Sequence, residues 1–119
     1  MALRKVIQRL NTPVSELDRQ RLRDFAASQP GVTPIAELAP RTLGLVVGEI
    51  SSMRIVPRAG SPSLEATITD GTGSLVAAWT GRRRIAGITP GRRLLLRGRG
   101  APTGPSGQLL LYNPDYELL

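Results

Sequence analysis

Two residue types on which many enzymes and metalloproteins depend are missing, because the 119-residue chain contains no cysteine and no histidine. Without cysteine, disulfide scaffolds, thiolate zinc sites and cysteine nucleophiles are excluded. Without histidine, the commonest general base and the commonest metal ligand are absent. No paired carboxylates with a nucleophile emerge from the rest of the chain. We therefore expect a protein that is not an enzyme and that uses no metal and no cofactor.

Long apolar runs are also missing. No segment approaches the roughly 18–20 apolar residues that span a bilayer. The N-terminal stretch MALRKVIQRL is basic but lacks the continuous apolar run of a secretory signal. We expect a cytoplasmic protein without membrane contact, folded around one core of the size that this length allows.

Acidic residues are scarce, with nine against 16 basic residues and a formal net charge of +7. Lys5 is the one lysine, so arginine carries almost all of the positive charge, as a GC-rich genome alone would produce. Residues 1–40 carry a net charge of +2 and residues 41–119 carry +5. Seven arginines fall between residues 82 and 99 without one acid. Such clustering favours a polyanionic partner, because binding to phosphates releases condensed counterions.

The first 40 residues predict a helical extension. Apolar residues recur at helical spacing between Leu3 and Leu10, and Thr12-Pro13 reads as the start of a second helix. Gln29-Pro30-Gly31 ends the helical pattern. We expect this extension to plug the end of the following domain or to pair with a partner.

A β-hairpin is the clearest local prediction. Leu64, Ala66 and Ile68 alternate with polar residues, and the same period of two continues from Leu75 to Thr80. The intervening turn, residues 70–73, supplies the glycines that a tight hairpin needs, and Asp70 is read as its turn former.

Further strands are predicted on both sides of this hairpin. Gly44 and Gly48 lie inside the first and indicate a bend or a bulge. Residues 56–63 read as a turn-rich loop, and residues 81–91 leave room for at most one helical turn. The predicted strands cover residues 43–55, 64–69, 75–80, 92–100 and 108–112, the last with a possible continuation at 116–119.

These elements predict an α+β, mainly β protein. One or two N-terminal helices (residues 1–40) precede a five-stranded Greek-key barrel of the OB type (residues 41–119). An SH3-like barrel is the structural alternative, although it has less need of a long, bent first strand.

Four motifs lie along residues 41–119: Gly48-Glu49-Ile50, Leu64-Glu65-Ala66 followed by Asp70-Gly71-Thr72-Gly73, Gly87 to Arg92, and Asn113 to Leu118. Together they resemble the OB-fold nucleic-acid-binding group and, more closely, small actinobacterial OB-fold proteins. The chain is also similar to the anticodon-binding OB modules of aminoacyl-tRNA synthetases and to the wedge domain of a branched-DNA helicase.

The resemblance implies a nucleic-acid-binding surface on the second and third strands and in the adjacent loops. That surface would include Arg58, Glu65, Thr67, Thr69, residues 74–80 and the loop at 100–107. The chain departs from the group in its aromatic content, because single-strand-binding domains usually stack bases on several aromatic rings. Only four aromatic residues are present: Phe25, Trp79, Tyr112 and Tyr116.

The candidate contact residues each have a structural interpretation as well. Trp79 shares the parity of Leu75 and Ala77, so packing is favoured over base stacking. The loop arginines Arg82, Arg83 and Arg84 are either solvated or bound to phosphate. A same-sign stripe on one strand face (Arg93, Arg97 and Arg99) repels itself unless an anion lies nearby. Glu49 and Glu65 are placed to pair with facing arginines.

The predicted function is non-catalytic nucleic-acid binding, mainly electrostatic, to single-stranded or branched DNA or to RNA. The alternative is a protein-interaction or assembly scaffold that docks a partner, or a second copy of the chain, through the barrel or the N-terminal helix. Convergence of the arginines on one face would favour nucleic-acid binding. Arginines scattered over the surface would favour the scaffold function. The predicted contact residues are Arg58, Thr67, Thr69, Trp79, Arg82, Arg83, Arg84, Arg93, Arg97 and Arg99.

Overall fold

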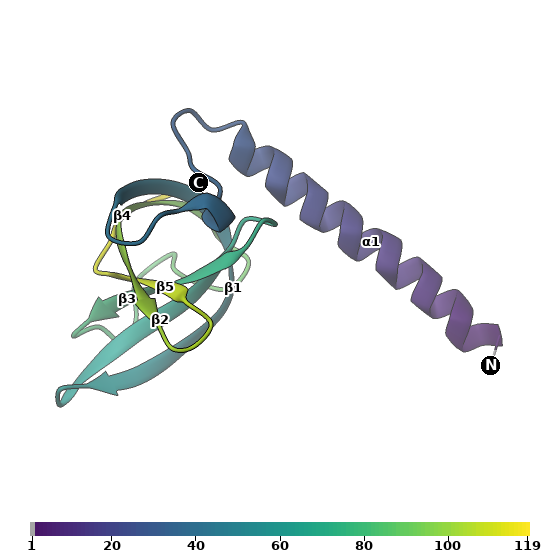
Figure 1. Ribbon diagram of the computed structural model, residues 1–119. Coiled ribbons are helices and arrows are strands. Elements are labelled where there is room, and N and C mark those ends of the chain that lie inside the picture. The colour runs from purple at the N-terminus through teal and green to yellow at the C-terminus, as the bar shows by residue number, and fades with distance from the viewer. Residues whose placement is uncertain (1) are drawn as a thin grey trace.

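A computed structural model describes the chain from Ala2 to Leu119, with side chains described from Ser15 onward. One long helix, α1, projects from a small β-barrel (Figure 1). The elements in chain order are α1 (Ala2–Ala27), the 3-10 turn η1 (Ile35–Glu37), β1 (Leu43–Arg58), β2 (Ser61–Thr69), β3 (Ser74–Thr80), β4 (Arg93–Thr103), β5 (Gln108–Tyr112) and β6 (Asp115–Leu118).

The strands form one closed sheet. Its order is β1-β2-β3-β5-β4, with β4 pairing back onto β1, and β6 adds a short strand on the far side of β4. All neighbours are antiparallel except β3 and β5, which run parallel. This is the five-stranded OB-type barrel that the sequence predicts. The continuation predicted after Asn113-Pro114 is a separate sixth strand paired with β4.

β1 closes the barrel because it pairs with two strands. Its first half, Leu43 to Glu49, lies against β4, and its second half, Glu49 to Arg58, lies against β2. The register shifts between Ile50 and Ser52, which is the irregularity that a strand shared by two sheets requires. Gly48 lies at this bend, where a Cβ atom would be 2.6 Å from Ile68 Cγ2 and 2.8 Å from the backbone oxygen of Thr69.

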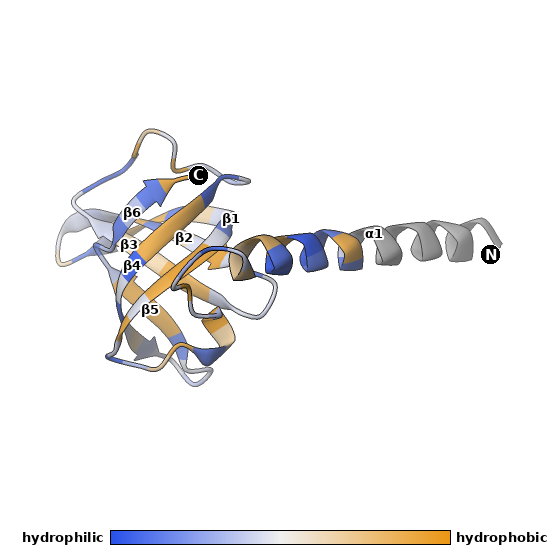
Figure 2. Cartoon of the chain, turned by 90° about the horizontal axis from the view of Figure 1, so that it is seen from above, coloured by the Kyte–Doolittle hydropathy of each residue, from blue (hydrophilic) through white to orange (hydrophobic). Residues whose placement is uncertain are grey.

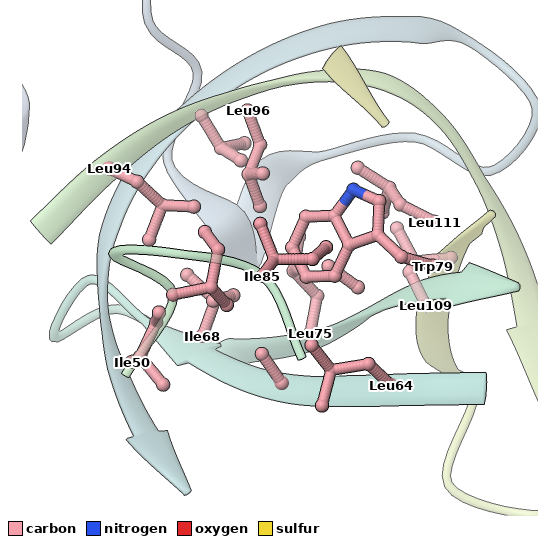
Figure 3. Close-up of a cluster of buried hydrophobic side chains, with 14 of the residues drawn as sticks. Ile50, Leu64, Ile68, Leu75, Trp79, Ile85, Leu94, Leu96, Leu109 and Leu111 are labelled. Carbon is pink, nitrogen blue, oxygen red and sulfur yellow. The ribbon is translucent and has the colours of Figure 1, made fainter. Parts of the chain in front are cut away.

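The barrel interior is apolar, and its residues come from every strand of the ring (Figures 2 and 3). Leu94 and Leu96 of β4 are fully buried, as their alternation with arginine predicts. Two connections also supply core residues. Ile85 and Ile88 come from the β3–β4 connection, and Ile35 of η1 brings the N-terminal segment into the same cluster. The N-terminal extension therefore helps to complete the core.

Two local predictions are wrong. Residues 56–63 form no loop, because β1 continues to Arg58 and β2 begins at Ser61. The two residues between them, Ala59 and Gly60, have φ angles of 49° and 81°. Positive φ at both central positions is typical of the primed hairpin turn, whose twist matches that of the strands.

The helix start predicted at Thr12-Pro13 is also wrong, since α1 runs continuously from Ala2 to Ala27. A proline inside a helix removes only one backbone hydrogen bond. Because apolar residues recur at helical spacing both before and after Pro13, one helix continues through it.

Asp70 fastens the N-terminal segment to the barrel. Its buried carboxylate accepts hydrogen bonds from the Thr72 backbone N–H (2.9 Å), the Thr72 hydroxyl (2.6 Å) and the Gly73 N–H (3.3 Å). The second carboxylate oxygen accepts the N–H of Ile35 at 2.9 Å. One side chain thus closes the β2–β3 turn and anchors η1.

The C-terminal end of α1 packs against the same region. Leu22 and Ala26 are buried, and Arg23 Nη2 donates to the Gly71 carbonyl at 3.2 Å. The guanidinium of Arg93 lies over the Phe25 ring, 4.6 Å from its centroid. These contacts set the direction in which α1 leaves the barrel.

Gly48→Ala tests the closure of the barrel. Because the added methyl group meets backbone as well as the Ile68 side chain, we expect a loss of about 1–3 kcal/mol in the free energy of unfolding. Urea denaturation followed by circular dichroism measures it. Gly98→Ala is the matched control, because its Cβ atom would lie no closer than 3.4 Å to any neighbour. Equal stability of the two variants would contradict the close approach at Gly48.

Asp70→Asn tests the link between η1 and the turn. The amide nitrogen of asparagine cannot accept the N–H and O–H groups that now donate to the Asp70 carboxylate. We therefore expect a loss of about 2–3 kcal/mol in the free energy of unfolding. Asp18→Asn, on an exposed part of α1, should change stability by less than about 0.5 kcal/mol. A neutral effect of the Asp70 substitution would show that the carboxylate does not hold the two segments together.

Candidate nucleic-acid interface

Positive side chains of the barrel lie in three separate places. Arg54 and Arg58 are on the β1–β2 hairpin, Arg82–Arg84 are in the β3–β4 connection, and Arg93, Arg97 and Arg99 are on β4. In the closed sheet, β4 is separated from β2 by β1 on one side and by β3 and β5 on the other. The predicted contact residues therefore come from three different parts of the barrel, and the strand order alone does not gather them on one face.

Two of the β4 arginines, Arg93 and Arg99, contact other parts of the chain, although Arg97 and Arg99 are exposed. The ring of Phe25 lies under Arg93, and Arg99 Nη1 donates to the Arg41 carbonyl at 3.3 Å. In the sheet register, Glu49 of β1 stands opposite Arg93 and Asp115 of β6 stands opposite Arg97. Carboxylate residues thus lie on both neighbouring strands, but within the described part of the chain no ion pair joins them to the arginines of the stripe.

The loop arginines make fewer contacts with the rest of the chain than Arg93 and Arg99 do. Arg82, Arg83 and Arg84 are all exposed, and within the described part of the chain none of them is in an ion pair. The loop starts beside the β1–β2 hairpin, because the Gly81 N–H donates to the Pro62 carbonyl at 2.7 Å. These three side chains are free to meet a phosphate backbone.

Trp79 is a core residue. It is 6% exposed, its indole N–H donates to the Pro114 carbonyl at 3.3 Å, and the Tyr116 ring meets it edge-on at 5.7 Å. Figure 3 shows the indole among Leu109, Leu111 and Ile85. No ring face remains for a base, so the inclusion of Trp79 among the contact residues is corrected to packing.

Arg58 holds a buried carboxylate. Glu65, predicted on the wet face of β2, is 2% exposed. Its oxygens accept Arg54 Nε at 3.1 Å and Arg58 Nε at 3.2 Å. The hydrogen bond to Glu65 raises the pKa of the Arg58 guanidinium above its usual value. The predicted pairing of Glu65 with facing arginines is therefore confirmed, and its partners cover it from water.

The polar side chains of the outer face line a shallow depression of about 300 Å³ beside this ion pair. Thr67 lies in it, half-buried, whereas Thr69 lies near the β2–β3 turn and its hydroxyl donates to the Gly73 carbonyl at 3.1 Å. Sequence reasoning missed three exposed or half-buried members of this face. The strand parity of Arg54, Gln108 and Tyr112 was the signal that could have identified them.

Within the described residues, no helix is both long enough and apolar enough to cross a bilayer. Three histidine, cysteine, aspartate or glutamate side chains do not come together anywhere in this part of the chain, as a metal site would need.

Comparisons with known proteins find the fold but no family. No family model and no curated protein matches the chain. Among solved structures, the chain is similar to RecG in the structure of RecG bound to a three-way DNA junction, with a TM-score of 0.61 and 17% sequence identity. The match covers 72% of this chain and 12% of the RecG chain. The barrel fold is thus shared with a small part of a much longer protein.

The position of Trp79 is testable by fluorescence, because it is the one tryptophan in the sequence. A buried indole is shielded from a charged quencher, so iodide should quench its emission far less than that of free tryptophan. Addition of an oligonucleotide should leave the emission unchanged. Strong iodide quenching of the folded protein, or quenching by the oligonucleotide, would place the indole on the surface.

Proposed function

We propose that this chain binds nucleic acid without catalysing a reaction, and that branched DNA is the form to test first. The supporting observation is the shared barrel fold with RecG, which was solved on a three-way DNA junction. A fold alone supports many functions, so the charges of this chain have to carry the rest of the argument.

Net charge supports a polyanionic partner. The chain carries +7, and a duplex presents about one negative charge per 1.7 Å of its axis. Arginine is well suited to phosphate, because its planar guanidinium donates two parallel hydrogen bonds. The absence of histidine and cysteine removes the usual catalytic side chains, which is why the proposal is binding alone.

The exposed loop of Arg82–Arg84 is the proposed phosphate contact. Its three cations are adjacent, exposed and free of ion pairs among the described residues. The β4 arginines also form no ion pair among the described residues, but Arg93 lies over Phe25 and Arg99 donates to the Arg41 carbonyl. The finer proposal is therefore that the loop, and not β4, supplies most of the electrostatic contact.

The scaffold alternative is supported by the distribution of the arginines over three parts of the barrel and by α1. This helix extends away from the barrel beyond its packed C-terminal turns (Figure 1), and Leu17 is 48% exposed. An exposed apolar side chain on a projecting helix is a feature that a protein partner or a second copy would cover. Absence of nucleic-acid binding would make this the leading function.

Fluorescence anisotropy tests the proposal with a labelled three-way junction, a duplex and a single strand at about 50 and 200 mM salt. We expect salt-dependent binding by the wild type. Replacing Arg82, Arg83 and Arg84 together by glutamine should reduce the slope of log K against log salt by about 3, since each phosphate contact contributes about 1.

The matched control replaces Arg19, Arg21 and Arg41 by glutamine, which removes the same charge from exposed positions elsewhere. If the control lowers the slope as much as the loop variant, binding depends on net charge and not on the loop. No binding at about 50 mM salt would reject the proposed function.

A further inference from the structure

A row of four residues crosses the outer face of the barrel. Arg54 of β1 is opposite Glu65 of β2, Glu65 is opposite Ala78 of β3, and Ala78 is opposite Tyr112 of β5. Directly paired residues lie on the same face of a sheet. Side chains from four strands therefore meet along one line.

Glu65 is out of place on a surface that meets a polyanion. Its side chain is 3% exposed, and an isolated buried carboxylate would be strongly unfavourable. Two guanidiniums compensate it, Arg54 through Oε1 and Arg58 through Oε2. One negative charge thus holds two positive ones, and this group of three side chains is left with a net charge of +1.

The two arginines remain available to a ligand. A guanidinium has five N–H donors, and the contacts with Glu65 use the Nε and one Nη of each arginine. The Arg54 side chain is 72% exposed and that of Arg58 is 36% exposed. Their remaining donors can reach phosphate oxygens without breaking the contacts that orient them.

Tyr112 places a ring beside this pair. Tyr112 stands at the end of the row and is 50% exposed, and the Arg58 Cζ atom lies over one side of its ring, 5.6 Å from the centroid. Ala78 between Glu65 and Tyr112 is fully buried and small, so Arg58 spans the gap. The depression that contains Ser52, Thr67 and Gln108 adjoins Arg54 and adds hydroxyl and amide groups.

We propose that Glu65 holds Arg54 and Arg58 in position so that both guanidiniums contact phosphate beside Tyr112. This surface then prefers single-stranded over duplex nucleic acid. The surface, named here the hairpin face, consists of Arg54, Arg58, Glu65 and Tyr112. The preference follows from the ring, because Tyr112 stacks on a base only when that base is unpaired. The inference rests on the proposed function and adds strandedness and a positioning residue to it.

The ring is tested by Tyr112→Leu, which keeps apolar bulk but removes the π-face. Stacking of one base corresponds to roughly a 5- to 150-fold change in affinity. The full chain should lose that factor for a labelled oligo-dT single strand and retain its affinity for a duplex of equal length. Tyr116→Leu is the matched control, because Tyr116 is similarly exposed, at 41%, but lies on β6.

The positioning role is tested by Glu65→Gln, for which two explanations predict opposite signs. If Glu65 only repels phosphate, its neutralisation tightens binding. If it orients the arginines, Glu65→Gln weakens single-strand binding several-fold although the protein gains positive charge, and Glu65→Asp restores part of the loss. Arg54→Gln, at a side chain that is 72% exposed, should weaken binding as well, and Arg21→Gln should not.

The outcomes separate the two proposals. Unchanged single-strand affinity of Tyr112→Leu, or tighter binding by Glu65→Gln, overturns the hairpin face while salt-dependent wild-type binding upholds the proposed function. Absence of wild-type binding to every probe overturns both. If Glu65→Gln fails to fold, the Tyr112 and Arg54 variants still decide the matter.

Discussion

The closed barrel, and with it the arrangement of side chains on its outer face, depends on one strand, β1, which pairs with two other strands of the sheet. β1 pairs with β4 through its first half and with β2 through its second half, and without that change of partner the sheet would remain open. The change requires a bend, and Gly48 allows it because no side chain fits between β1 and Thr69. Closure buries Leu94 and Leu96 of β4 in the same core as Ile68 of β2.

Closure also decides which charges are neighbours. The second half of β1 continues past the core as a hairpin with β2, so Arg54 and Arg58 are held across from Glu65. A buried carboxylate is unfavourable by itself, and the two guanidiniums compensate it. The same contacts restrict where the guanidiniums point. A requirement of stability therefore also gives the outer face a fixed arrangement of donors.

Much of the fold could be predicted because alternation reports burial directly. Leu64, Ala66 and Ile68 face inward as their spacing indicates, and the Asp70 turn lies where its glycines place it. The hairpin turn at Ala59-Gly60 was missed because residues 56–63 contain two prolines, one glycine and two serines, a composition typical of a longer loop. Only two of those residues form the turn, and Pro57 and Pro62 stand opposite each other in the ladder.

The candidate site was harder to predict because it depends on contacts between distant segments. The arginines between residues 82 and 99 are close in sequence, yet they lie on different elements. Arg82–Arg84 are in the β3–β4 connection, whereas Arg93, Arg97 and Arg99 are on β4. The burial of Glu65 depends on Arg54 and Arg58, which lie on another strand, and no local pattern reports it. Trp79 has the parity of a core residue, and that signal was the correct one.

The most direct test of nucleic-acid binding is a titration of the ¹⁵N-labelled full chain with a three-way DNA junction at about 50 mM salt, followed by amide chemical shifts. The account predicts shift changes that saturate and that gather at Arg54, Tyr112 and residues 81–84, with little change at Arg93 and Arg97. A spectrum that does not change would contradict nucleic-acid binding itself. Changes confined to β4 would contradict the assignment of the surface.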